Sequence, residues 1–175
     1  MSISIQPSEL SKKLIEEVKS QFGSVPPHFE IFAVVNPERF KIFLDEIVYL
    51  SNHKSIDPDL FAFLRLYTAK REVFSYCQLF NTKLLLSKGY TKDEIEESMS
   101  DIEAIPLDDR HKALAKNAVN AIFSPQTLND KEIESLLSLG WSHSDVYDAV
   151  DHVAYLLRHG RVIQVFLKNY PIGIA

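Results

Sequence analysis

The chain has 175 residues, of which 46% are hydrophobic, and its formal net charge is −5 at pH 7. This length suits one globular domain with a sizeable core, so we expect a single domain over residues 1–175. The negative charge argues against a general affinity for nucleic acid or for anionic membranes. With 5 glycines, 8 prolines and good helix formers throughout, the composition predicts an all-α fold.

Three features of the sequence bear on where the protein works. The single cysteine excludes a disulfide framework within the chain and suits a reducing cytoplasm. The first residues, MSISIQPSELSKK, lack the basic start and apolar core of a signal peptide. No apolar run approaches the ~20 residues that a membrane-spanning helix requires. We therefore expect a cytoplasmic protein with neither membrane nor nucleic-acid partners.

Capping residues and apolar spacing predict two helices in the first third of the chain. Ser8 caps the first helix and Gly23 ends it. Residues 24–32, with the sequence SVPPHFEIF, contain two prolines, and we expect an extended connector there. Asn36 and Pro37 begin the second helix.

Residues 57–89 contain the only cysteine, Cys77, and are the segment from which the fold and the candidate site are predicted. Asp57 followed by Pro58 is typical of a helix start, because the carboxylate accepts from free N–H groups and proline presets φ. Two series of apolar residues with helical spacing follow, and Gly89 ends the second series. We expect buried helices here, one of them carrying the cysteine.

Capping residues and helix-ending residues in the second half of the chain predict four more helices. Thr91 and Glu94 have the spacing of a capping box, which starts a short acidic helix. Further helices are expected over residues 107–123, from Asn129 to Gly140, and over roughly 143–168 in a long last helix. All of these elements agree with the all-α prediction.

Two segments of the sequence repeat. LLLSKGYTKDEI at 84–95 and SLLSLGWSHSDV at 135–146 share a Leu-Leu-Ser triplet, a glycine, an aromatic residue and a capping residue in the same order. Each copy predicts a helix that is ended by glycine and followed at once by a newly capped helix. The repeat favours two related helical halves.

The segment FSYCQLFN resembles the alkylhydroperoxidase D (AhpD) / carboxymuconolactone decarboxylase superfamily, whose redox members carry C-x-x-C-x-x-x-H at this place. In that register Phe74 stands at the first cysteine, Cys77 at the second and Asn81 at the histidine. Tyr76, a residue type common just before the second cysteine, supports this register. The glutamate of the family falls on Ala62.

The resemblance extends beyond this motif. VPPHFEIFAVVNPERF is similar to the entry segment of the peroxidase-related members, and YDAVDHVAYLLRHGR is similar to their C-terminal half. The resemblance implies an AhpD-like all-α fold and a homo-oligomer whose central helices pack together. The content of 11 phenylalanines and 7 tyrosines agrees with such extensive burial.

For activity, the resemblance implies a thiol-dependent peroxidase. In such an enzyme the second cysteine attacks the peroxide and becomes a sulfenic acid, and the first cysteine converts that sulfenic acid to a disulfide. Cys77 would attack, with a pKa lowered by Lys70, Arg71 or Arg65. Because Phe74 has no sulfur, the resolving thiol would come from another molecule, so an external thiol reductant is an expected partner. No cofactor is expected.

The proton relay of the redox members is missing from this chain. The asparagine at position 81 cannot take up a proton at neutral pH, and the alanine at position 62 contributes no polar group. Glu72 is a candidate to replace the missing proton acceptor. The alternative interpretation is a solvated charge beside Lys70 and Arg71. Without a relay, Cys77 equally fits the role of a small apolar core residue.

The last helix carries a second set of candidates. Asp148, His152 and His159 share one helical face, and a carboxylate with two imidazoles suits acid–base chemistry or a metal. No H-E-x-x-H or other metal-specific pattern occurs, so we predict no metal site. Arg158 and Arg161 flank His159; binding an acidic ligand is one reading, and pairing with the acidic helix near residue 96 is the preferred one. The candidate substrate-binding residues are Tyr76, Arg65, His152 and Arg158.

Three hypotheses follow. A thiol-dependent peroxidase with an antioxidant role predicts a partly exposed, acidified Cys77. A catalytically inactive oligomeric scaffold or ligand-binding protein predicts a buried, unreactive Cys77. A cysteine-independent, decarboxylase-like acid–base enzyme predicts a small carboxylated substrate held by Asp148, His152 and Arg158. The residues themselves favour the second hypothesis, because the relay is absent.

Overall fold

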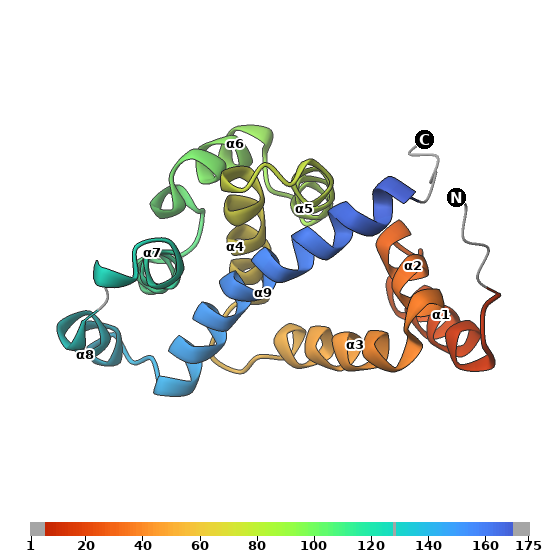
Figure 1. Ribbon diagram of the computed structural model, residues 1–175. Helices are drawn as coiled ribbons and strands as arrows, with labels where there is room; N and C mark the ends of the chain where they lie inside the picture. Colours follow the sequence, from red (N-terminus) through yellow and green to blue (C-terminus); the bar gives the residue numbers. More distant parts are fainter. Residues whose placement is uncertain (1–5, 128, 170–175) are drawn as a thin grey trace. The chain divides into compact units, whose positions relative to one another are not determined.

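The computed structural model describes residues 6–127 and 129–169, and in this part of the chain it contains nine α-helices, two short 3₁₀ helices and no strand (Figure 1). The all-α prediction is therefore confirmed. The chain divides into two compact units. The N-terminal unit covers the chain up to Asn52 and again from Val162, and the central unit covers His53–Arg161.

Three helices make up most of the N-terminal unit: α1 (Glu9–Phe22), α2 (Pro27–Val35) and α3 (Pro37–Ser51). The predicted caps are confirmed, since the Ser8 side chain accepts a hydrogen bond from Ser11 N and Gly23 has φ +74°. Asn36 likewise accepts from Arg39 N at the start of α3. The buried core of this unit consists of Leu14, Val18, Phe29, Ala33 and Phe40.

The prediction of an extended connector over residues 24–32 is wrong. The structure forms α2 there, beginning at Pro27 after an extended Pro26. Proline is well tolerated at the first helical position, because the N–H it lacks would have no partner within the helix. The two prolines therefore start a helix, and Phe29 then reaches the core from its buried face.

The central unit contains six α-helices. They are α4 (Pro58–Arg71), α5 (Ser75–Ser87), α6 (Lys92–Ser100), α7 (Asp109–Phe123), α8 (Asp130–Ser138) and α9 (His143–Asn169), with 3₁₀ turns at Ile102–Ala104 and Pro125–Thr127. Of α9, the residues up to Arg161 belong to this unit. The helix α4 lies at the middle and packs against α5, α6 and α7 (Figure 1).

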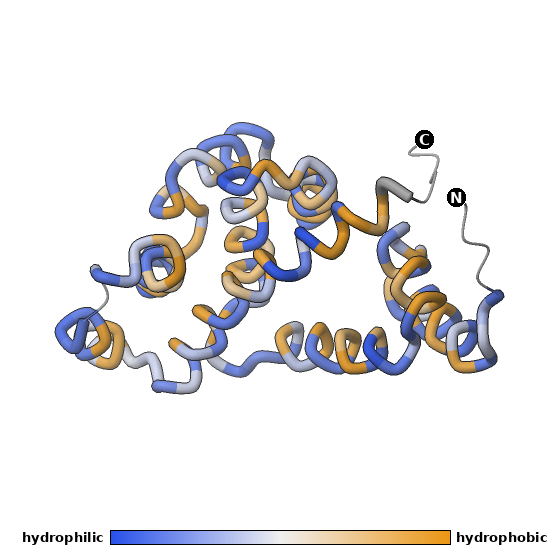
Figure 2. Tube along the Cα trace, viewed as in Figure 1, coloured by the Kyte–Doolittle hydropathy of each residue, from blue (hydrophilic) through white to orange (hydrophobic). Residues whose placement is uncertain are grey.

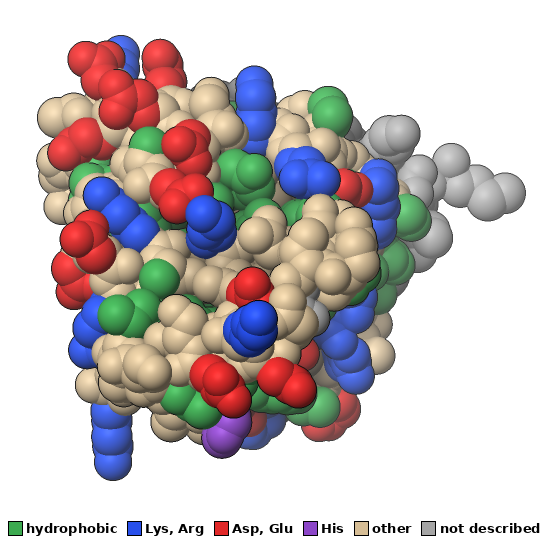
Figure 3. All heavy atoms as spheres, turned by 90° about the vertical axis from the view of Figure 1, so that its left-hand side faces the viewer, with side chains coloured by type: hydrophobic (Ala, Val, Ile, Leu, Met, Phe, Trp, Pro, Cys, Tyr) green, Lys and Arg blue, Asp and Glu red, His purple; other side chains and the backbone are tan. Residues whose placement is uncertain are grey.

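Burial on all sides distinguishes α4 from its neighbours. Figure 2 shows hydrophobic residues along much of α4, whereas α6 is largely hydrophilic. Figure 3 shows acidic side chains gathered at the top of one face, where α6 lies. The buried residues of α4 are Leu60, Phe61, Ala62, Phe63, Leu64, Leu66, Thr68 and Ala69. A helix apolar nearly all round is expected in such a central position.

The repeated segments adopt the same local structure. In both copies a glycine with positive φ ends a helix, Gly89 at +98° and Gly140 at +87°. A capped helix follows each time, with a capping box at Thr91 and Glu94 in the first copy. In the second copy Ser142 Oγ accepts from Asp145 N. The helix–glycine–helix prediction is confirmed in both places.

The turn between α4 and α5 has the same pattern of backbone hydrogen bonds as the turn at Gly89, but it contains no glycine. Phe74 N donates to Ala69 O at 2.8 Å and Val73 N donates to Lys70 O at 3.3 Å, which is the pattern of a Schellman motif. The residue in the left-handed conformation is Val73, with φ +56°. A β-branched residue is strained at this angle. The turn leads directly into the helix that carries the cysteine.

None of the helices in the described ranges is long and apolar enough to cross a membrane.

Candidate functional site

Cys77 lies in the first turn of α5 and is only 4% exposed. Burial raises the pKa of its thiol to about 11, and the positive charge of Arg65 opposes this shift without overcoming it. Of the three cations considered for this role, Arg71 instead lies over the ring of Phe123, with its Cζ 4.2 Å from the ring centroid, and Lys70 is exposed. The thiol is thus buried, and Arg65 is the cation of the described residues whose charge acts on it.

Arg65 joins three helices in a polar cluster at the centre of the unit. From α4, its Nε donates to Asn81 Oδ1 on α5 at 2.9 Å, and its Nη1 donates to His152 Nε2 on α9 at 3.0 Å. Asn81 Nδ2 in turn donates to Cys77 O at 2.8 Å. We call Arg65, Asn81 and His152 the arginine cluster. It brings together three of the residues named from the sequence.

His152 is held in its neutral form. A guanidinium can only donate, so His152 Nε2 accepts. Burial lowers the pKa of His152 well below its usual value, and the charge of Arg65 lowers it further. The ring of Tyr155 stacks on His152 at 5.5 Å and on His159 at 4.8 Å. Burial, followed by the charges of Arg158 and Arg65, lowers the pKa of His159 to about 3.

The arginine cluster carries a net positive charge. Among the described residues, no carboxylate forms an ion pair or hydrogen bond with Arg65. Burial lowers the pKa of Arg65, and the only groups that act in the opposite direction are Tyr155 and Cys77. Neither group is a carboxylate, so no carboxylate of the described residues balances the guanidinium charge locally.

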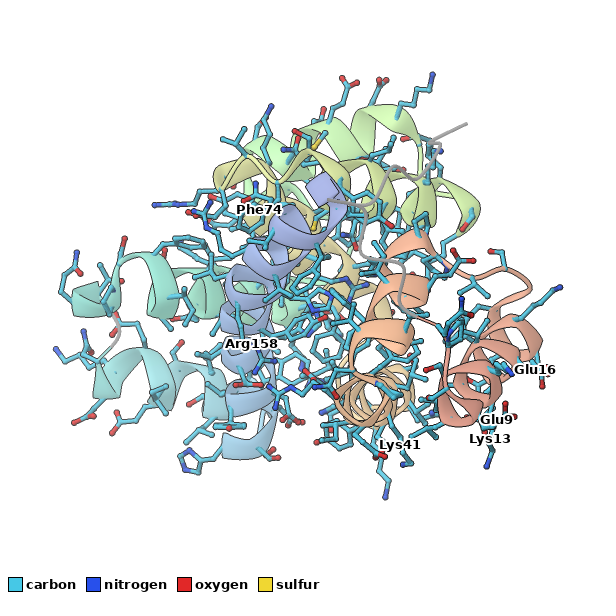
Figure 4. The ribbon with its side chains drawn as sticks, turned by 45° about the vertical axis from the view of Figure 1, so that its right-hand side comes forward. Glu9, Lys13, Glu16, Lys41, Phe74 and Arg158 are labelled. Atoms are coloured by element: carbon cyan, nitrogen blue, oxygen red, sulfur yellow. The ribbon has the colours of Figure 1, made fainter. Side chains whose placement is uncertain are left out.

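Phe74 fills the place of the first cysteine with a packed ring. It is 1% exposed and lies against Gly160 of α9, where an added Cβ would overlap the ring. Arg161 covers the ring with its Cζ 4.8 Å from the centroid, and Figure 4 shows Phe74 beside α9. The phenylalanine therefore closes this position by packing against a glycine.

Glu72, the candidate substitute base, forms an ion pair with Arg161 of α9. Glu72 Oε2 accepts from Arg161 Nη2 at 2.9 Å, an ion pair that the sequence did not predict. Ala62 is buried within α4, at the position where the family resemblance places a carboxylate. Glu72 is thus committed to an arginine on α9 rather than to the thiol of Cys77.

Tyr76 and Arg158 each contact an aromatic ring. Tyr76 is half-buried and stacks on Phe80 with 6.4 Å between centroids. Arg158 is exposed, with its Cζ 5.7 Å from the ring of Tyr155 (Figure 4). The positive charge of Arg158 contributes to the lowered pKa of His159.

Asp148 belongs to a different cluster, which sequence reasoning missed. Its Oδ2 lies 3.2 Å from His53 Nε2, and Asp145 Oδ1 lies 3.7 Å from the same nitrogen. His53 Nδ1 accepts from Ser55 N at 3.2 Å and from Ile56 N at 3.0 Å. Because Nδ1 accepts, the proton is on Nε2 and points to the carboxylates. We call His53, Asp145 and Asp148 the carboxylate cluster.

The predicted stripe on the last helix is therefore divided between two environments. Asp148 contacts His53, whereas His152 contacts Arg65 and His159 stacks on Tyr155. Within the described ranges, no group of three or more His, Cys, Asp or Glu residues is arranged to hold a metal ion. The stripe does not assemble into one site.

No protein-family model matches the chain, and no curated protein matches it either. Solved structures do. A peroxidase-related protein from Silicibacter sp. TM1040 matches with a TM-score of 0.79 at 15% identity, covering 95% of this chain and 89% of that one. A peroxidase-related protein from Ralstonia eutropha JMP134, described as an alkylhydroperoxidase AhpD core, matches with a TM-score of 0.76 at 16% identity over 96% and 91% of the two chains.

The chain has an AhpD-like fold. The resemblance noted in the sequence is confirmed at the level of structure. Neither of these two proteins has an assigned activity in its description. At 15–16% identity the likeness establishes the fold alone, and the chemistry depends on the residues of this chain.

Proposed function

We propose that this protein is a ligand-binding member of the AhpD-like structural class that does not turn over hydroperoxides through Cys77. The observation that carries the proposal is the environment of the thiol. It is buried, its pKa is raised to about 11, and the hydrogen bonds of Arg65 go to Asn81 and His152. This is the environment that the second hypothesis expects.

The protonation state of Cys77 limits its reactivity. With a pKa of about 11, about one thiol in ten thousand is ionised at pH 7, whereas a free cysteine with a pKa of about 8.5 is ionised to about 3%. The thiolate is the nucleophile. No described residue near Cys77 is placed to take its proton, because Asn81 uses its amide nitrogen on the backbone of Cys77 itself.

A thiol-dependent peroxidase is the second candidate, and one observation favours it. Arg65 lies close enough to Cys77 to lower the pKa of the thiol, although burial outweighs that effect. This function requires the first turn of α5 to expose the thiol and a resolving thiol from another molecule. An antioxidant role would follow only under those conditions.

The decarboxylase-like acid–base function receives less support. Its three candidate residues lie in separate contacts: Asp148 against His53, His152 against Arg65, and Arg158 exposed beside Tyr155. His152, held neutral by burial and by a neighbouring cation, is a poor proton acceptor.

A homo-oligomer remains part of the proposal. On α5, Leu79 is 43% exposed and Leu86 is 38% exposed, and large apolar side chains on one helix are common where protomers meet. A cytoplasmic location and an external thiol reductant stay predictions from the sequence.

The proposal is tested by the second-order rate of Cys77 oxidation by hydrogen peroxide and by cumene hydroperoxide. Trapping of the sulfenic acid follows the reaction, and Cys77→Ser provides the blank. The same protein in denaturant provides its own free thiol as a reference. We expect the native rate to be lower than the denatured rate by about two orders of magnitude, as the thiolate fractions imply. A native rate above that of the free thiol would overturn the proposal.

A further inference from the structure

We infer that Arg65 binds the carboxylate group of a small organic acid. This inference rests on the proposed ligand-binding function and names the class of ligand for the same site. It draws on three features of the arginine cluster: the donors that Arg65 has left, the absence of a local counter-charge, and the fixed orientation of the guanidinium.

The guanidinium of Arg65 has N–H groups beyond those that bind Asn81 and His152. Of its five N–H groups, one on Nε reaches Asn81 and one on Nη1 reaches His152. Three remain: the second on Nη1 and both on Nη2. Arg65 is half-buried rather than sealed, so these donors are not all enclosed by protein. Two oxygens of a carboxylate match neighbouring guanidinium N–H groups in a bidentate pair.

Among the described residues of the central unit, no carboxylate pairs with the charge of Arg65. Ala62 lies three residues earlier on the same face of α4, where a carboxylate would have been adjacent. On the face of α9 that carries His152, the carboxylate of Asp148 is directed to His53. A partly buried charge without a counter-ion is costly. An anionic ligand would remove that cost by supplying the missing negative charge.

The neighbours of Arg65 hold it in one orientation. Asn81 is fixed by its bond to Cys77 O, and His152 is fixed between the ring of Tyr155 and the ring of Phe61, the latter at 4.9 Å. A donor set fixed before binding loses little entropy when the ligand arrives. These surroundings are aromatic and apolar, which favours an acid with an apolar body over a fully hydrated ion.

The first experiment uses calorimetric titration of the full chain in low-chloride buffer at pH 7. The probes are benzoate, acetate and benzamide, the last having the shape of benzoate without its charge. We expect saturable binding of benzoate, weaker binding of acetate, and at least tenfold weaker binding of benzamide. Equal affinity for benzoate and benzamide, or no binding of either anion, would overturn the inference.

Two substitutions localise the binding. Asn81→Asp is nearly isosteric and supplies an internal carboxylate to Arg65 Nε, so we expect benzoate affinity to fall by at least tenfold. Arg65→Lys keeps the charge but loses the planar fork, and a smaller loss is expected. Arg39→Gln, which removes an exposed arginine on α3, is the control for general charge effects and should bind as the wild type does. Circular dichroism of each variant verifies folding.

The outcomes separate this inference from the proposed function. Cys77 oxidation is measured on the same samples, without any anion. An inert thiol together with no anion binding leaves the proposed function in place and removes the inference. If the thiol is oxidised rapidly and Asn81→Asp abolishes benzoate binding, the proposed function is overturned and the inference about Arg65 stands. Benzoate binding that neither Asn81→Asp nor Arg65→Lys weakens places the anion elsewhere and overturns the inference.

Discussion

The arginine cluster and the carboxylate cluster lie one turn apart on α9, yet they hold opposite charges. In the carboxylate cluster, Asp145 and Asp148 both face the Nε2 of His53. In the arginine cluster, His152 accepts from Arg65, and no acid of the described residues pairs with that cation. The two histidines accept hydrogen bonds through different ring nitrogens. His53 uses Nδ1 as an acceptor for backbone N–H groups, and His152 uses Nε2 as an acceptor for a guanidinium.

The backbone that supports the two clusters also differs. The carboxylate cluster stands on the first turn of α9, where Ser142 and Asp145 satisfy each other's free N–H groups. The arginine cluster depends on α5, which begins after the strained turn at Val73. In the carboxylate cluster the carboxylates and the helix cap are hydrogen-bonded, whereas the arginine cluster keeps an unbalanced cation and a strained support. Strain and unsatisfied charge concentrate at functional sites, so the difference directs attention to Arg65.

The largest expected effect is a loss of stability in acid, which originates on the arginine side of the comparison. The pKa of His159 is lowered from 6.5 to about 3. A group whose folded pKa is lowered contributes stability above its unfolded pKa and loses it as pH falls through the folded pKa. We expect the free energy of unfolding to fall by up to about 4 kcal/mol from this residue between pH 6.5 and pH 3. Urea unfolding across this range measures the loss.

The matched variant for this prediction is His159→Gln, which keeps a polar side chain but has no proton to gain. Its unfolding free energy should fall less steeply with decreasing pH than that of the wild type. If the unfolding free energies of the two proteins fall in parallel with pH, His159 does not contribute to the acid sensitivity. That result would contradict the lowered pKa of the buried His159.

Breaking the carboxylate cluster is expected to have the next largest effect. His53→Ala removes the donor to Asp148 and the acceptor for two backbone N–H groups. Loss of one partner in a buried polar cluster costs about 3 to 4 kcal/mol. His53→Asn can restore the acceptor near the position of Nδ1 and should recover part of the loss. Chemical denaturation of both variants checks this, and equal stability of wild type and His53→Ala would contradict it.

A smaller effect is expected in alkali, from the thiol beside Arg65. The pKa of Cys77 is raised from 9.0 to about 11, so its contribution to stability is complete below pH 9 and is lost as pH rises through 11. The expected loss is about 2 to 3 kcal/mol. Cys77→Ala lacks this titration, so the difference between its pH curve and that of the wild type isolates the thiol. A constant difference from pH 8 to pH 11 would mean that the thiol is not desolvated.

Much of the fold could be predicted from the sequence because the signals that set it are local. Caps such as Ser8, Asn36 and Asp57 act on N–H groups two or three residues away, and Gly89 and Gly140 end helices through their own φ. The one wrong assignment, at residues 24–32, arose because a proline pair fits an extended segment and a helix start equally well in sequence.

The candidate site was only partly predictable, because its contacts join distant parts of the chain. Arg65 was named as a cation for Cys77, but its bond to His152 spans 87 positions, and no spacing rule reports such a pair. His53 belongs to no sequence motif, although it contacts Asp148 across 95 positions. Helical spacing correctly placed Asp148 and His152 on one face of α9. It could not show that different neighbours would separate them.

The smallest expected effect concerns the strained turn that supports the arginine cluster. Val73→Gly removes the strain of a β-branched residue at φ +56°, worth about 1 to 3 kcal/mol, and adds about 0.5 to 1 kcal/mol of unfolded-state entropy. Because Val73 is 71% exposed, little packing is lost. We expect a net gain of about 1 kcal/mol, or about 2 to 4 °C in melting temperature.

Gly89→Val is the matched control, since the same hydrogen-bond pattern surrounds Gly89 and nothing lies within 4 Å of an added Cβ. It should lower the melting temperature. The rate of Cys77 alkylation should stay unchanged in Val73→Gly, because the packing of Phe74 on Gly160 also holds the start of α5. Faster alkylation in the more stable variant would mean that the strained turn itself keeps the thiol buried, and the strain would then belong to the site.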